Sequence, residues 1–298
     1  MTLPLLWSEF LPATGCDWVI IIGFVQNKQN SPETDASGEV LTSAGGNAVS
    51  VATVVSRVAA SVVEITTETI VQSGRVGQYI TSGAGSGVIV SREGFIVTNH
   101  HVIDGANTIT VRLNNGTEYA AALVGSDSET DIAVLWINAN ENDLTVATLG
   151  SSRDLVVGED IIAIGNPLGS LGGTVTEGMV SATARQISVS GSSMTLLQVS
   201  APINPGNSGG ALVNARGELV GINAMLYSQT GSFSGYGFAI PTTIMTKVVD
   251  DLKNFGTVQR AMLGIQYTDV SNYIAMQHEK GQDPDLGTLT GLYINEVV

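Results

Sequence analysis

Residues 204–213 read Asn-Pro-Gly-Asn-Ser-Gly-Gly-Ala-Leu-Val, which places one serine, Ser208, between glycines and ahead of an apolar run. A nucleophilic serine needs an exposed hydroxyl and backbone N–H donors for the developing oxyanion. The glycines let the chain turn tightly and bring the N–H groups of Gly206 and Ser208 toward one point, with Asn207 between them. A glycine-rich hairpin turn with an incidental serine is the other interpretation, but the Asn-Pro-Gly-Asn and Gly-Gly flanks favour the catalytic one.

The chain after the serine reads as strand, turn and strand, because residues 209–222 hold two apolar runs around a turn at 215–217. This context argues against an α/β-hydrolase, in which a helix follows the serine. The residue order of such an enzyme is nevertheless present, with Asp250 or Asp251 and then His278 after the serine. The chymotrypsin-like framework fits better, and it requires a histidine and an aspartate upstream.

Two adjacent histidines, His100 and His101, stand where the predicted strand 95–98 ends and a short helical turn begins. A strand end presents a base well, but spacing alone does not decide which histidine acts. Together with Asp104 the pair also suggests a metal site. Adjacent side chains diverge, however, and no further His or Cys cluster completes a coordination shell, so we expect no metal.

The candidate for the acid is Asp131, which directly precedes the apolar run 132–135. An acid at the rim of the core can orient an imidazole and stabilise its cation. Asp127 and Asp104 are rivals, and Asp131 also fits a plain turn. The residues by themselves therefore leave the choice of acid open.

Composition limits the function classes. The chain has 298 residues, 43% of them hydrophobic and only 13% charged, which excludes a charge-driven disordered protein and a coiled coil. The net charge of −15 makes nucleic acid a poor partner. One cysteine, Cys16, excludes an intrachain disulfide and a Cys-rich zinc site.

The middle of the chain is rich in short β runs, with about a dozen between residues 85 and 240, which indicates antiparallel barrels or a sandwich. A helix is expected within 48–63 and a second over 242–255, with Ile244, Val248, Val249 and Leu252 on its apolar face and Gly256 as its stop. We expect three parts: an N-terminal segment 1–47, a main domain 48–257 and a C-terminal unit 258–298.

The N-terminal segment permits three interpretations. Residues 1–26 are apolar but carry no Lys or Arg, and the run 18–25 is too short to span a bilayer. The segment fits an atypical signal or membrane anchor, a disordered or wrongly started terminus, or lipidation at Cys16. Residues 27–47 read as a flexible linker.

Several spaced motifs together resemble the HtrA/Deg serine proteases. They occur in the family's order over about residues 48 to 268: Thr-Asn-His-His-Val (98–102), Ser-Glu-Thr-Asp-Ile-Ala-Val-Leu (128–135), Ile-Gly-Asn-Pro-Leu-Gly (164–169), Ile-Asn-Pro-Gly-Asn-Ser-Gly-Gly-Ala-Leu-Val-Asn (203–214) and Gly-Phe-Ala-Ile-Pro (237–241). The resemblance implies an all-β dominated, trypsin-like double six-stranded β-barrel with an N-terminal and a C-terminal helix.

The resemblance also implies roles for individual residues. The family's base falls on His101, with His100 in a variable slot; its acid falls on Asp131 and its nucleophile on Ser208. Its oxyanion hole falls on the turn from Gly206 through Asn207 to Ser208, with the N–H groups of the first and last as donors. No metal or organic cofactor is implied.

The implied activity is a serine endopeptidase that cleaves unfolded or misfolded proteins in quality control of the bacterial envelope. The family implies a periplasmic or other extracytoplasmic location and a homotrimer or larger assembly. One of the three interpretations of the N-terminal segment adds membrane anchoring. The alternative is a catalytically latent, chaperone-like binder of unfolded polypeptides.

One departure from the family pattern concerns the active-site loops, since residues 199–200 read Val-Ser where the family often has Thr-Asp. Asn207 is part of the matching motif, but digestive trypsin-like enzymes have at this place an aspartate that pairs with a new N-terminus, so activation by that ion pair is not expected here. Control by loop ordering is the natural replacement, with 185–194 and 226–236 as candidate loops or plain hairpin tips. By the resemblance, 222–237 helps to line a specificity pocket for small or medium apolar residues.

The C-terminal unit resembles the start of a PDZ domain at Ala-Met-Leu-Gly-Ile (261–265). Only the stretch 262–298 follows, and it stops before the helix that completes a PDZ groove. We therefore expect a PDZ domain that is incomplete in this chain and does not bind peptide C-termini.

Overall fold

The computed structural model describes residues 50–73, 77–166, 173–189, 192–204, 206–224, 236–261, 264–283 and 291–297. The chain divides into two compact units. One spans Ser43–Gln259, and the other holds the C-terminal residues from Arg260 onward. Each unit is described separately below.

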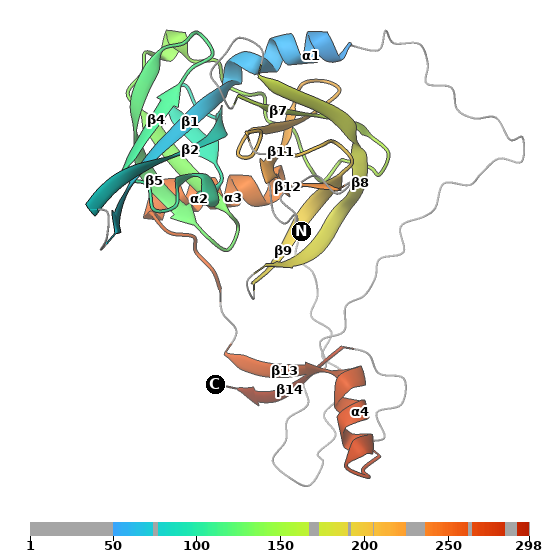
Figure 1. Cartoon of the computed structure of the whole chain (residues 1–298). Helices are drawn as coiled ribbons and strands as arrows, with labels where there is room; N and C mark the ends of the chain where they lie inside the picture. The colour runs from blue at the N-terminus through green and yellow to red at the C-terminus, as the bar shows by residue number, and fades with distance from the viewer. Residues whose placement is uncertain are drawn as a thin grey trace, which may run out of the picture. The chain divides into compact units, whose positions relative to one another are not determined.

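The larger unit consists of two closed antiparallel barrels of six strands each, as the family resemblance implies (Figure 1). In the first barrel the strand order is β1-β2-β3-β6-β5-β4. Its strands are β1 (Val62–Ser73), β2 (Gly77–Ile89), β3 (Phe95–Thr98), β4 (Thr108–Arg112), β5 (Glu118–Asp127) and β6 (Ile132–Ile137).

The second barrel has the order β10-β11-β12-β9-β8-β7. Its strands are β7 (Asp160–Gly165), β8 (Thr174–Val189), β9 (Ser192–Val199), β10 (Ala211–Asn214), β11 (Leu219–Ala224) and β12 (Gly237–Pro241). The stretch 185–194 belongs to the β8–β9 hairpin except for 190–191, which lie outside the described residues. Of the other candidate loop, 226–236, only Tyr236 is described.

Three apolar clusters hold this unit together. One fills the first barrel around Ile65 and Leu135, and another fills the second around Leu197 and Leu212. The third cluster joins residues of both barrels, among them Val134. Strands whose two faces are buried read as continuous apolar runs, which explains the unbroken run in β6. The third cluster therefore forms a separate apolar core that fixes the two barrels against each other.

Helix α3 (Thr242–Phe255) strengthens this junction, since it packs on β5 and β6 of the first barrel and on β11 and β12 of the second. Its buried stripe contains Met245, whereas Ile244, which the sequence analysis placed there, is only half-buried. A stripe at 245, 248, 249 and 252 follows the helical period, and residue 244 lies at its edge. Gly256 ends the helix with a left-handed φ of 72°.

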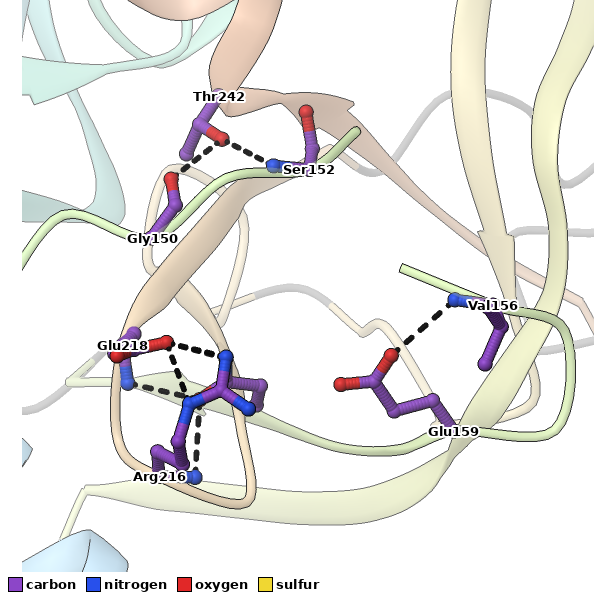
Figure 2. A network of polar contacts seen from close by, with 8 residues as sticks. Gly150, Ser152, Val156, Glu159, Arg216, Glu218 and Thr242 are labelled. Carbon is purple, nitrogen blue, oxygen red and sulfur yellow. Dashed lines mark hydrogen bonds and ion pairs between the residues drawn. The ribbon is translucent and has the colours of Figure 1, made fainter. Parts of the chain in front are cut away.

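Polar contacts fix the entry to α3 and a neighbouring hairpin (Figure 2). The Thr242 hydroxyl donates to the Gly150 carbonyl at 3.1 Å and accepts from the Ser152 N–H at 3.0 Å. In the turn between β10 and β11, the Arg216 guanidinium lies 2.7 Å from the Glu218 carboxylate, which lowers the pKa of Glu218 and raises that of Arg216. The Thr242 bonds thus tie the start of α3 to residues 150–152, and the Arg216–Glu218 pair lies within the β10–β11 turn.

Helix α1 (Val51–Val58) begins at Ser50, whose side chain accepts from the Thr53 N–H. Its buried face packs beside the β10–β11 turn. Helix α2 (His100–Ile103) is the single turn expected after β3.

The C-terminal unit holds β13 (Ile265–Asp269), α4 (Val270–Glu279) and β14 (Leu292–Val297). The two strands pair antiparallel, and the Tyr273 and Tyr293 rings stack with centroids 3.8 Å apart. The sequence predicts β character at both ends of this unit, and the structure adds the helix between them.

Candidate active site

The histidine end of the site is built by the turn that follows β3. Asn99 is the N-cap residue of helix α2 and has an extended conformation, so His100 and His101 occupy the first helical positions. The two imidazole rings contact different residues, Ser126 for His100 and Asp131 for His101. The His101 Nδ1 atom lies 2.8 Å from the Asp131 Oδ2, and the His101 N–H donates to the Asp131 Oδ1 at 3.0 Å. His101 is therefore held by the acid through both its ring and its backbone.

Asp131 stands just before β6 in an unusual backbone conformation. Its φ of 55° is the one positive value among non-glycine residues in the described part of the chain. The Asp131 carbonyl accepts from the His100 N–H at 3.1 Å and from the Asn99 Nδ2 at 3.0 Å. The residue is 5% exposed. Strain of this kind persists where surrounding contacts over-determine it, and it concentrates at functional sites.

The rival residues have other partners. Asp127 accepts from the Thr130 N–H at 3.0 Å and closes a local turn. Asp104 is 73% exposed and lies 3.8 Å from the His100 Nε2, while the His100 Nδ1 lies 3.1 Å from the Ser126 Oγ. The structure thus brings His101 together with Asp131 and directs His100 away from that pair.

The nucleophile candidate comes from the other barrel, in the turn before β10. The Ser208 Oγ lies 2.9 Å from the His101 Nε2, which completes a continuous chain of contacts from Ser208 through His101 to Asp131. The same hydroxyl lies 3.0 Å from the Asn99 Oδ1. A hydroxyl has one proton, so the ring nitrogen and the amide oxygen are alternative acceptors for it.

Asn99 is a residue that the sequence analysis quoted but did not place in the site. It is fully buried, and its amide joins the nucleophile to the backbone of the acid. Because its Nδ2 donates to a carbonyl, its oxygen must face Ser208, which fixes the orientation of the amide. Asn99 follows β3 directly and stands between the polar residues Thr98 and His100, so the local sequence carries no signal that sets it apart.

The turn that carries Ser208 is held from several sides. Gly206 has a φ of 109°, which is accessible to glycine. The Asn207 N–H donates to the Asn204 carbonyl at 3.2 Å, and the Asn207 side chain bonds the Asn204 N–H and the Pro202 carbonyl at 3.0 and 3.1 Å. The buried, neutral Asn207 thus frames the turn, while Gly206 and Ser208 remain the predicted oxyanion donors.

The predicted specificity pocket and the α/β-hydrolase alternative remain to be compared with the structure. Of the pocket segment 222–237, residues 222–224 lie on β11, and 225–235 lie outside the described residues. Ser208 is followed by a strand, and His278 belongs to the C-terminal unit, where it lies 3.1 Å from Asp283. The double barrel excludes the α/β-hydrolase alternative.

Within the described residues, no group of three or more His, Cys, Asp or Glu side chains could hold a metal ion. None of the helices described for this chain is long and apolar enough to cross a membrane. The predicted anchor or lipidation site at Cys16 lies outside the described residues.

Comparison with known proteins supplies independent information. The family model for a trypsin-like peptidase domain matches residues 85–222. A probable periplasmic serine endoprotease DegP-like of Marinomonas sp. (strain MWYL1) is 48% identical over 194 residues, which cover 65% of this chain and 40% of that protein. The serine protease Do-like HtrA of Bacillus subtilis (strain 168) is 43% identical over 226 residues, which cover 72% of this chain and 50% of that protein. The chain thus spans half or less of the length of these curated relatives.

A solved structure agrees with this result over a larger share of both chains. The structure of the HtrA-type protease AlgW with a decapeptide is similar at a TM-score of 0.71 and 37% identity. The similarity covers 84% of this chain and 79% of that one.

Proposed function

Because the chain belongs to the HtrA/Deg family of trypsin-like serine proteases, we propose that it is a serine endopeptidase that uses Ser208, His101 and Asp131. The observation that carries the proposal is the pair of contacts at His101, 2.9 Å from Ser208 on one side and 2.8 Å from Asp131 on the other. Such contacts lie within hydrogen-bond reach and match the geometry that nucleophile activation needs.

In the first half of the reaction, Asp131 keeps the proton of the imidazole on Nδ1, so the Nε2 lone pair faces Ser208. The Ser208 Oγ attacks a peptide carbonyl while His101 takes its proton, and the carbonyl oxygen becomes an oxyanion. The N–H groups of Gly206 and Ser208 stabilise that charge. His101 then gives the proton to the leaving amine, which leaves an acyl ester on Ser208.

In the second half, His101 takes a proton from water, which attacks the ester and forms a second tetrahedral intermediate. Return of the proton to the Ser208 oxygen releases the new carboxyl terminus. No step needs a metal ion or an organic cofactor. The Asp131 carboxylate stabilises the His101 cation in both halves.

We propose unfolded or misfolded proteins as substrates, a location in the bacterial envelope and a homotrimeric or larger assembly. The names of the relatives support a periplasmic endoprotease. Anchoring by the N-terminal segment is part of the same proposal. The latent, chaperone-like alternative requires an inactive site, whereas the assembled contacts of Ser208 favour an active one.

A direct test incubates the full chain with one protein in its native form and in a permanently unfolded, reduced and alkylated form. Cleavage of the unfolded form by the wild type and not by Ser208→Ala is the expected result. Binding of the unfolded form without cleavage would support the latent alternative. Cleavage by both variants would show a contaminating protease and leave the proposed site without a role.

A further inference from the structure

Ser86 lies on β2 of the first barrel, at the point where this barrel touches the turn that carries Ser208. Its side chain is fully buried. The Ser86 N–H donates to the Ser208 carbonyl at 2.9 Å, and its carbonyl accepts from the Thr98 hydroxyl at 2.7 Å. Its Oγ donates to the Gly206 carbonyl at 2.5 Å and accepts from the Asn166 N–H at 2.8 Å.

We propose that Ser86 is a positioning residue that fixes the nucleophile turn of the second barrel against the His101–Asp131 pair of the first. The proposal rests on the proposed function and deepens it. Ser86 makes hydrogen bonds to the residues on both ends of the segment that supplies the nucleophile and the oxyanion donors, and it makes them from the barrel that supplies the base.

The bonds of Ser86 act through the rigidity of the peptide unit. Each peptide is planar, so fixing a carbonyl also fixes the N–H of the next residue. Ser86 fixes the peptides after Gly206 and after Ser208, while the Gly210 N–H fixes the peptide between them through the Asn207 carbonyl at 3.0 Å. Three successive peptides around the nucleophile are therefore held, and two of the three bonds come from Ser86.

The fit between the barrels at this point leaves little freedom. Gly209 has a φ of 80°, and a Cβ atom built there would collide with the Ser86 carbonyl oxygen and the Thr98 hydroxyl. The turn therefore lies directly on β2. A shift of the turn would change the distance between the Ser208 Oγ and the His101 Nε2, and small misplacements of reacting groups reduce rates strongly.

The side chain and the backbone of Ser86 have separable roles. Ser86→Ala keeps the N–H bond to the Ser208 carbonyl and removes the bonds to Gly206 and Asn166. We expect kcat for a peptide substrate to fall by roughly 10- to 100-fold with KM nearly unchanged. A peptide boronate mimics the tetrahedral intermediate, and the affinity for it should fall by about the same factor as kcat. The reason is that Ser86→Ala weakens the contacts made to the transition state and leaves those made to the bound substrate.

The matched control is Ser61→Ala. Ser61 is 1% exposed, and its Oγ donates to the carbonyl of Val58, the last residue of helix α1, at 2.7 Å. Ser61→Ala therefore also deletes a buried hydroxyl that bonds a backbone carbonyl. The experiment measures kcat, KM and boronate affinity for the wild type and both variants. It also measures amide hydrogen exchange at Asn166, whose N–H loses its acceptor only in Ser86→Ala.

The expected result is a fall in kcat and boronate affinity together with faster exchange at Asn166 in Ser86→Ala, and wild-type behaviour in Ser61→Ala. Equal kcat in the two variants, or unchanged exchange at Asn166, would overturn the positioning role. If the wild type itself has no activity, the proposed function fails. In that case hydrogen exchange still tests the role of Ser86: faster exchange at Asn166 and at the amides of the nucleophile turn in Ser86→Ala supports it, and unchanged exchange contradicts it.

Discussion

Replacement of Asp131 by asparagine tests how the acid controls His101. The His101 N–H donates to the Asp131 Oδ1, so the oxygen of the introduced amide must remain at that position. The amide NH₂ group then faces the His101 Nδ1, which lies 2.8 Å from the present Oδ2. An NH₂ group can only donate, so the ring proton must move to Nε2, where it faces the Ser208 Oγ.

This tautomer cannot accept the Ser208 proton, so nucleophile activation is lost while the contacts remain in place. Inversion of the tautomer in such a triad lowers kcat by roughly 10⁴-fold, or about 5 kcal/mol of transition-state stabilisation. Asparagine tolerates positive φ values at least as well as aspartate does, so the backbone at 55° adds no new strain. Asp131→Asn should therefore lose activity while its stability stays close to that of the wild type.

The assay compares kcat on a peptide substrate and the thermal midpoint of unfolding for the wild type, Asp131→Asn and the control Asp127→Asn. Asp127 bonds Thr130 in a turn, so its replacement should change kcat by less than about tenfold. A value of kcat for Asp131→Asn within about tenfold of the wild type would refute the role of Asp131. A large fall in the midpoint would instead show a structural role for it.

Four further predictions use single substitutions. His101→Ala should abolish labelling by a fluorophosphonate probe, whereas His100→Ala should leave it within about twofold, because the His101 ring contacts Ser208 and the His100 ring contacts Ser126; gel fluorescence checks both. Gly209→Ala should lower the free energy of unfolding by at least ~2 kcal/mol in urea, since its φ of 80° disfavours a side chain and its Cβ would collide with neighbouring backbone. Asn99→Ala should cost about 1–3 kcal/mol by the same method and lower kcat about tenfold, because both of its buried hydrogen bonds are lost. Burial raises the pKa of Glu64 above its ordinary value, so the native state binds more protons than the unfolded state between the two values. The contribution of Glu64 to stability is therefore present below the ordinary pKa and is lost as pH rises through the raised pKa. Glu64→Gln should remove this part of the fall in the free energy of unfolding with pH, measured by urea unfolding from pH 4 to 8. The same pH dependence in the variant and the wild type would contradict this.

The sequence predicts the main elements of the fold because alternation and turn signals are local properties. The short strands, the helix over 242–255 and its stop at Gly256 follow from such patterns. The motifs around Ser208, His101 and Asp131 carry enough local information to select these residues among rivals once the family resemblance is used.

Other features depend on packing between distant segments and leave weak local signals. Asn99 and Ser86 are ordinary polar residues in the sequence, and each bonds a residue of the nucleophile turn that lies more than 100 residues away. Asp131, with its positive φ, accepts through its carbonyl from the Asn99 side chain, which lies 32 residues earlier in the chain. Met245 is buried in the core that joins the two barrels and Ile244 is partly buried against it, so the choice between them depends on packing.

The central claim is that Ser208 is an activated nucleophile. The most direct measurement is the intact mass of the full chain after incubation with a fluorophosphonate probe, for the wild type and for Ser208→Ala. The account predicts one adduct on the wild type, located on the peptide that contains Ser208, and none on the variant. An unlabelled wild type, or equal labelling of the two proteins, would contradict it.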